Sequence, residues 1–173
     1  MKTLGLRFLC LKDLIFGIDE GRIYAGNSSG ADDSQLNSRT VGFTYQAAYD
    51  ARMYRTMFNN NINYFSSWSF LSGGLLAGNP TVSYHVASNA AKFDGAKLAK
   101  IKTTWRVLFP NIEVDAVSAY NEETKTVHVM AYNYKNDVDY ENTAKLNFKL
   151  KVPQFDCDKV KVTAYVIDDS CNY

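Results

Sequence analysis

The chain has 173 residues, of which 46% are hydrophobic and 21% charged. This is the composition of a folded globular protein, and the length allows one domain or two small ones. Nineteen basic against eighteen acidic residues leave a net charge of +1, and no window gathers Lys and Arg with aromatic residues on one face. Nucleic acid is therefore not an expected partner.

The N-terminal run MKTLGLRFLCL resembles a signal peptide only superficially. Arg7 interrupts the apolar stretch, Lys12 and Asp13 end it, and no small-residue cleavage site follows. We expect neither a signal peptide nor a membrane span in this chain. A preceding segment could carry a secretion signal, so the sequence leaves the localisation open.

In the first half of the chain, the apolar run at 14–18 predicts a buried parallel strand. It opens into an acidic pair, Asp19 and Glu20, and then into a long polar stretch at 22–39. Such a stretch is too long for a tight connection, which makes it a candidate functional loop.

Residues 41–59 carry apolar side chains at three- and four-residue intervals and end in consecutive asparagines, which predicts a helix with a C-cap. The aromatic run at 62–68 predicts a second strand. Another helix is predicted to begin at Pro80, with Asn79 as its cap, and to continue until Gly95. The order strand, helix, strand, helix predicts parallel strands joined by crossover helices.

After Gly95 the helical period disappears and we expect a change to an all-β region at the Asp94-Gly95 turn. The pattern there predicts short strands at 98–105, 112–120, 126–134, 144–152 and 160–167. The polar run from Asn121 to Thr124 predicts a hairpin turn before the third of these. This half is therefore predicted to be an antiparallel sheet or a sandwich.

The cysteines, Cys10, Cys157 and Cys171, form neither a CxxC pair nor a spacing with His that is typical of zinc. No metal site and no cofactor are expected. Cys157 and Cys171 flank one predicted strand, which leaves both a disulfide and two free thiols open. His85 and His128 lie in a predicted helix and a predicted strand, where packing or surface roles are expected.

Two strand-helix units cannot close a barrel, which needs eight strands and about 250 residues. Two interpretations follow. Either the chain is a piece of a larger protein, or the two units pack on the β half as a small α+β fold.

Three stretches resemble the closing section of clan-A glycoside hydrolases: GIDEGRI at 17–23, TYQAAYDARMYRTMFNNNINYFSSWSF at 44–70 and AYNYKND at 131–137. The similarity is nearest to family 39, which comprises β-xylosidases and α-L-iduronidases. It implies that residues 1–94 are the last two βα units of a (β/α)8 (TIM) barrel catalytic domain, and that residues 95–173 are an antiparallel β-sandwich. It also implies an extracellular or periplasmic retaining hydrolase that cleaves O-glycosidic bonds in carbohydrates.

The resemblance assigns roles to particular residues. Glu20 matches the nucleophile at the carboxyl end of barrel strand seven, and Trp68 matches the substrate-facing aromatic residue of strand eight. Asp19 and Arg22 are expected to contact the carbohydrate substrate. The chain departs from the family pattern, in which Trp usually follows the nucleophile, because Gly21 follows Glu20 here.

The acid/base glutamate of such enzymes has no counterpart, since the Asn121-Glu122 pair falls in the predicted hairpin turn. Retaining hydrolysis needs two carboxyl groups about 5–5.5 Å apart. We therefore expect the chain to be inactive alone and to require the missing N-terminal barrel strands as its partner. The alternative is a noncatalytic carbohydrate-binding or interaction module that uses its aromatic residues, which make up 14% of the chain.

Overall fold

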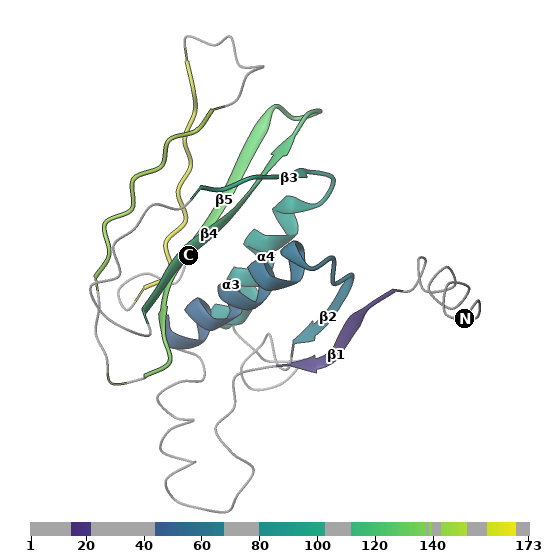
Figure 1. Cartoon of the computed structure of the whole chain (residues 1–173), viewed down its shortest axis with the longest axis vertical. Coiled ribbons are helices and arrows are strands. Elements are labelled where there is room, and N and C mark those ends of the chain that lie inside the picture. Colours follow the sequence, from purple (N-terminus) through teal and green to yellow (C-terminus); the bar gives the residue numbers. More distant parts are fainter. Residues whose placement is uncertain are drawn as a thin grey trace, which may run out of the picture.

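The computed structural model describes residues 15–21, 44–67, 80–102, 112–137, 139, 143–151 and 159–168. Its elements are shown in Figure 1. In chain order they are β1 (Gly17–Gly21), α3 (Thr44–Asn59), β2 (Tyr64–Ser67), α4 (Val82–Ala90), the 3-10 helix η1 (Ala91–Phe93), β3 (Lys97–Ala99), β4 (Ile112–Asn121) and β5 (Thr126–Lys135).

Strands β1 and β2 form a parallel pair, and α3 connects them along the chain. The predicted order of strand, helix, strand and helix is therefore confirmed. The first strand lies further along the chain than predicted, at 17–21 in place of 14–18. The backbone N–H of Phe16 donates to Asn63 Oδ1 (3.2 Å), and the N–H of Asn63 donates to the carbonyl of Phe16 (2.8 Å). These bonds tie the start of β1 to the residue before β2.

Helix α3 ends in the C-cap that its asparagines predict. The N–H of Asn60 donates to the carbonyls of Thr56 and Met57, and the N–H of Ile62 donates to the carbonyl of Met57 at 3.0 Å. Asn61 has a φ of 53°, a left-handed conformation that Asn tolerates better than most residues. The chain is thereby turned directly into β2.

Helix α4 begins at Val82 with Thr81 as its N-cap, two residues later than the predicted cap at Asn79. The change from helix to strand falls where it was predicted. Helix η1 ends at Phe93, Gly95 adopts a φ of 68°, and β3 begins at Lys97. Glycine suits this left-handed position because it has no Cβ to clash with the backbone.

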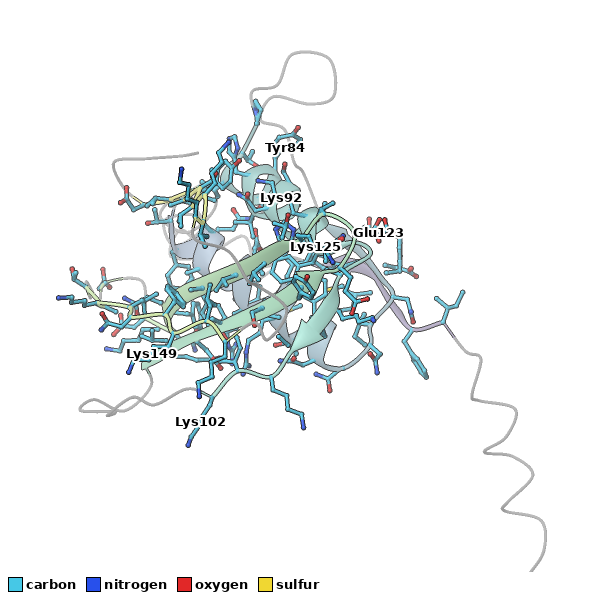
Figure 2. The ribbon with its side chains drawn as sticks, turned by 90° about the horizontal axis from the view of Figure 1, so that it is seen from above. Tyr84, Lys92, Lys102, Glu123, Lys125 and Lys149 are labelled. Atoms are coloured by element: carbon cyan, nitrogen blue, oxygen red, sulfur yellow. The ribbon has the colours of Figure 1, made fainter. Side chains whose placement is uncertain are left out.

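Strands β3, β4 and β5 form an antiparallel sheet in that order. The predicted hairpin between β4 and β5 is confirmed, and its turn closes on Asn121, whose Oδ1 accepts bonds from the N–H groups of Glu123 and Thr124 at 3.0 Å each. Lys125 completes the turn with a φ of 53°. Glu123 and Lys125 are labelled in Figure 2. Asn121 and Glu122 thus belong to a turn, as the sequence indicated.

Two strands predicted in the C-terminal part are not found in the structure. The described residues 143–151 and 159–166 form no strand, and Ile167 makes only an isolated bridge. The remaining predicted strand, at 98–105, is represented by β3 at its start, and its residues 103–105 lie outside the described residues. A strand needs a partner for its backbone groups, which an alternating sequence pattern alone does not supply.

The two helices pack against the antiparallel sheet, as Figure 1 shows. One core combines buried residues of both helices and of β5: Ala47, Ala51, Val82, Val86, Tyr132 and Tyr134. A second combines Phe93 with Val117 and Ala119 of β4, and the Phe93 ring stacks on Phe58 at 5.3 Å between ring centroids. This mixed packing suits the small α+β alternative as well as a barrel end covered by a sandwich. The barrel, the sandwich and the division at residues 94/95 remain predictions.

Gly17 is a position where the sheet needs glycine. A Cβ added there would lie 2.6 Å from Tyr64 Cδ1 and 3.0 Å from Tyr64 Cβ. We expect Gly17→Ala to lower the free energy of unfolding by roughly 1–3 kcal/mol, because atoms so close to the Tyr64 backbone cannot easily move away. Urea unfolding measures this loss. Tyr64→Ala should cost less stability in the Gly17→Ala background than in the unaltered chain, because it removes the ring atom at 2.6 Å. Equal costs in both backgrounds would contradict the steric explanation.

Candidate functional site

The carboxyl end of β1 carries a β-bulge at the predicted site. Gly17 pairs with Tyr64 and Ile18 with Phe65, but the next paired residue of β1 is Gly21, which pairs with Ser67. Two residues of β1, Asp19 and Glu20, therefore lie opposite one residue of β2. A bulge bends its strand and re-aims side chains, and bulges are frequent beside active sites.

The register also brings the two strand ends together. Gly21 lies opposite Ser67, so Glu20 precedes the last paired residue of β1 while position 68 follows the last residue of β2. Glu20 therefore belongs to the carboxyl edge of this parallel pair, where α/β proteins place their sites. The Asp19 side chain is exposed. Arg22 and Trp68, the other predicted substrate-binding residues, lie outside the described residues.

A buried polar group joins the two helices α3 and α4. Gln46 Nε2 donates to Ser83 Oγ at 2.7 Å, and Ser83 Oγ donates to Asp50 Oδ2 at 2.5 Å. All three residues are at most 3% exposed. Buried polar groups that are hydrogen-bonded in this way fix the relative position of the elements that carry them. We did not predict this group, although Gln46 and Asp50 lie four residues apart on one helix face.

Ion pairs attach α3 to β4. Arg52 Nε lies 2.6 Å from Glu113 Oε2, and Tyr132 donates its hydroxyl hydrogen to Glu113 Oε1 at 2.5 Å. Arg55 pairs with Asp115 and lies 4.0 Å from Glu113. Because arginines pair with the carboxylates of both Glu113 and Asp115, these residues hold the helix on the sheet. The sequence contains a weak signal for it, since Arg52 and Arg55 are three residues apart and Glu113 and Asp115 alternate along a strand.

The pKa of Glu113 is lowered from its ordinary value of 4.5. Burial alone would raise it, but the hydrogen bonds from Tyr132 and Arg52 and the charges of Arg52 and Arg55 outweigh burial. Because the folded-state pKa is the lower one, this contribution to stability is present above pH 4.5 and is lost as the pH falls through the folded pKa.

We expect Glu113→Gln to flatten the dependence of unfolding free energy on pH below about 4.5, since the neutral amide cannot gain this proton. Urea unfolding between pH 7 and pH 3 measures the slope. Glu122→Gln is the matched control, because Glu122 forms an exposed pair with Lys97 at 3.1 Å. Equal slopes for the two variants would show that Glu113 is not responsible.

A tyrosine cluster lies where α3 meets the end of β5. The hydroxyls of Tyr45 and Tyr134 are hydrogen-bonded to each other at 3.2 Å, and Asn136 Oδ1 is an acceptor within reach of both, at 3.3 Å and 3.1 Å. The Arg52 guanidinium lies 5.3 Å from the centre of the Tyr134 ring. Burial, followed by the hydrogen bond with Tyr45, raises the pKa of Tyr134, so its hydroxyl stays protonated at neutral pH.

The two histidines belong to other elements than β1, which carries the bulge. His128, on β5, contacts the Phe93 ring at 5.8 Å between centroids, and burial and the charge of Lys92 lower its pKa. His85, on α4, contacts the ring of Tyr84 at 5.6 Å. Both make the packing contacts expected from the sequence.

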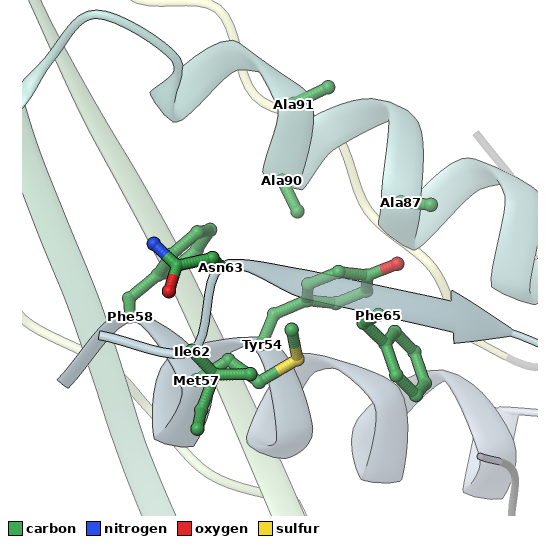
Figure 3. Close-up of a pocket in the computed structure, with 9 residues that line it drawn as sticks. All are labelled: Tyr54, Met57, Phe58, Ile62, Asn63, Phe65, Ala87, Ala90 and Ala91. Atoms are coloured by element: carbon green, nitrogen blue, oxygen red, sulfur yellow. The ribbon is translucent and has the colours of Figure 1, made fainter. Parts of the chain in front are cut away.

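An apolar hollow of about 240 Å³ lies between α3, β2 and α4 (Figure 3). Its lining combines the rings of Tyr54 and Phe65 with the small side chains of Ala87 and Ala90. Asn63, which precedes β2, also lines it. Burial, followed by the charge of Asp50, raises the pKa of Tyr54 to about 12. The Tyr54 hydroxyl therefore stays protonated at neutral pH.

Within the described ranges, no cluster of three or more His, Cys, Asp or Glu side chains could hold a metal ion. None of the helices there is long and apolar enough to cross a membrane.

Comparison of the chain with protein-family models, with curated proteins and with solved structures finds no match. The resemblance to clan-A glycoside hydrolases therefore rests on the quoted residues and on their order along the chain.

Proposed function

We propose that the chain is the C-terminal piece of a retaining glycoside hydrolase and that Glu20 is the nucleophile. The observation that carries the proposal is the bulged parallel pair, in which the predicted nucleophile lies in the bulge at the carboxyl end of β1. Active sites of (β/α)8 barrels are built from residues at the carboxyl ends of their strands.

The open edges of the two-stranded sheet support the view that the chain is incomplete. Within the described residues, β1 and β2 pair only with each other. Tyr64 is 49% exposed, and Ile15 and Phe16, which precede β1, are 79% and 55% exposed. Two strands with exposed aromatic residues and no further partner among the described residues are stabilised by neighbouring strands. Further parallel strands from a preceding segment would supply them.

The proposed reaction uses Glu20 in its ionised form. Its carboxylate attacks the anomeric carbon, and a carboxylic acid from one of the preceding strands protonates the departing oxygen. Water then hydrolyses the covalent glycosyl-enzyme, with the second residue acting as base. Trp68 would stack on a sugar ring, and Asp19 and Arg22 would bind its hydroxyls. This chemistry requires no metal and no cofactor.

A mechanism-based label tests the proposal directly. The protein is expressed with its upstream reading frame restored, treated with 2-deoxy-2-fluoro glycosides and digested for mass spectrometry. We expect a covalent sugar on the peptide that contains Glu20. A label on another peptide would refute the assignment, as would an upstream frame that encodes no further strand-helix units.

A noncatalytic carbohydrate-binding or interaction module is the alternative. The 240 Å³ hollow lined by aromatic residues is the observation that favours it. It predicts that a polysaccharide cast into the gel slows the migration of the chain alone in affinity electrophoresis. Tyr54→Ala should weaken this retardation, and Glu20→Gln should leave it unchanged.

A further inference from the structure

Two described segments in the C-terminal part of the chain, residues 143–151 and 159–166, expose apolar side chains to water. Among these side chains are Leu146 (42% exposed), Phe148 (54%), Leu150 (59%), Val160 (70%), Val162 (82%) and Val166 (51%). Neither segment forms a strand. Exposed apolar surface of this kind is found where proteins bind ligands, other proteins or membranes.

The same two segments carry only positive charge. They contain five lysines and no Asp or Glu, although the whole chain has a net charge of only +1. The lysine side chains, all of them exposed, are Lys145, Lys149, Lys151, Lys159 and Lys161. The partner that these segments fit is therefore negatively charged as well as partly apolar.

Lysines and apolar residues alternate along both segments. Between 145 and 151 the even-numbered positions are apolar and the odd-numbered positions hold Lys or Asn, and residues 159–162 alternate in the same way. Figure 1 draws both segments as extended runs, and Figures 1 and 2 both place them on the flank of the molecule away from β1 and β2. Because successive side chains of an extended chain point to opposite faces, each segment has one apolar and one basic face.

This combination fits the surface of an anionic lipid bilayer. Amphipathic elements with lysines on one face and Leu or Phe on the other lie in the plane of the bilayer surface. Their apolar side chains enter the boundary of the acyl chains, and their lysines reach the headgroups through flexible stems. Nucleic acid or an acidic polysaccharide would pair with the lysines but leave the apolar side chains in water.

We propose that residues 143–151 and 159–166 bind the surface of membranes that contain anionic lipids, with Phe148 inserted between the headgroups. Lys92 of η1 lies over the Tyr165 ring at 3.6 Å, so the second segment is attached to the folded part of the chain. Binding of this segment would therefore hold the whole chain at the membrane. The contact lies on the bilayer surface, and it does not depend on the proposed hydrolase activity.

Flotation of the full chain with lipid vesicles gives the first test. We expect binding to phosphatidylcholine vesicles that contain about 30% phosphatidylserine to be at least roughly tenfold tighter than binding to phosphatidylcholine alone, because several lysines meet the negative surface. Raising NaCl from about 0.05 to about 0.5 M should weaken the binding, since salt screens the charges. Equal binding to both vesicles, or binding to neither, would overturn the proposal.

Two variants, each with a matched control, give the second test. Phe148→Ser removes the ring without changing the charge and should weaken binding to the anionic vesicles by roughly tenfold or more, whereas its neighbour Asn147→Ser should change it by less than about twofold. Lys149→Gln should weaken it by roughly fivefold. Its control is Lys125→Gln in the hairpin turn, which Figure 2 labels well apart from Lys149 and which should have less than about a twofold effect. Equal effects of a variant and its control would overturn the proposal.

Three further outcomes would assign the segments to another partner and overturn membrane binding. Binding to heparin that Lys149→Gln weakens, with vesicle binding that Phe148→Ser leaves unchanged, would indicate a site for polyanions. A dimer in lipid-free solution that Phe148→Ser dissociates would show that a second copy covers the apolar side chains. Slow hydrogen exchange of the amides at 144–150 without vesicles, together with a melting temperature that Phe148→Ser lowers by roughly 5 °C or more, would show that the chain itself covers them.

Discussion

If the chain is the proposed hydrolase, Glu20→Gln in the protein with its upstream reading frame restored is expected to lower kcat by roughly 10⁴-fold or more. Glutamine keeps the shape of the side chain but cannot attack the anomeric carbon, so the covalent intermediate is not formed. The melting temperature should change little, because the substitution removes a charge at a strand end without creating a cavity. Steady-state kinetics with an aryl glycoside, together with thermal unfolding, measure both quantities.

Asp19→Asn is the matched control, because Asp19 lies in the same bulge and its side chain is exposed. It should affect KM more than kcat if Asp19 only binds substrate hydroxyls. Glu20→Ala in the presence of azide adds a second readout, since the small anion can attack in place of the carboxylate and yield a glycosyl azide. Full activity of Glu20→Gln, or a product of inverted configuration from the unaltered enzyme, would eliminate Glu20 as nucleophile.

The largest effect on stability is expected from Ser83→Ala. Ser83 Oγ accepts a hydrogen bond from Gln46 and donates one to Asp50, and all three side chains are buried. Alanine leaves both partners short of one hydrogen bond in the interior, which costs about 1–3 kcal/mol for a neutral group and more for a charged one. The melting temperature should fall by roughly 4–12 °C.

Ser88→Ala serves as its control, because Ser88 is an exposed residue of the same helix, and it should change the melting temperature by roughly 1 °C or less. Differential scanning calorimetry of the two variants measures the contrast. If Ser83→Ala and Ser88→Ala have the same melting temperature, the buried polar group does not hold α3 against α4.

The helix cap and the turns could be predicted from the sequence because the residues at those positions determine them. The asparagines after α3 form the C-cap, Asn121 closes the hairpin turn, and Gly95 takes the left-handed conformation that ends the helical region. Each of these depends on backbone preferences of the residues themselves. The position of β1 was less accurate, because an apolar run does not distinguish a paired strand from the exposed residues before it.

Contacts between distant parts of the chain were not predictable in this way. Arg52 and Glu113 are 61 residues apart, and the paired spacing of the arginines and of the carboxylates does not say that the two sets meet. Gln46 and Asp50 are polar residues, which the sequence alone predicts to be exposed to solvent. Both are nevertheless buried, beside Ser83. The bulge at Asp19 and Glu20 is likewise a property of two strands in register, so only the strand end could be predicted from one strand.

The shared core has a consequence for synthesis of the chain. The faces of α3 and α4 that carry Ala47, Ala51 and Val86 are covered by Tyr132 and Tyr134 of β5. A ribosome adds roughly 5–20 residues per second, N-terminus first. Both helices are therefore complete for several seconds before β5 exists to cover them, and their apolar faces are open to chaperones or to neighbouring nascent chains until β5 is made.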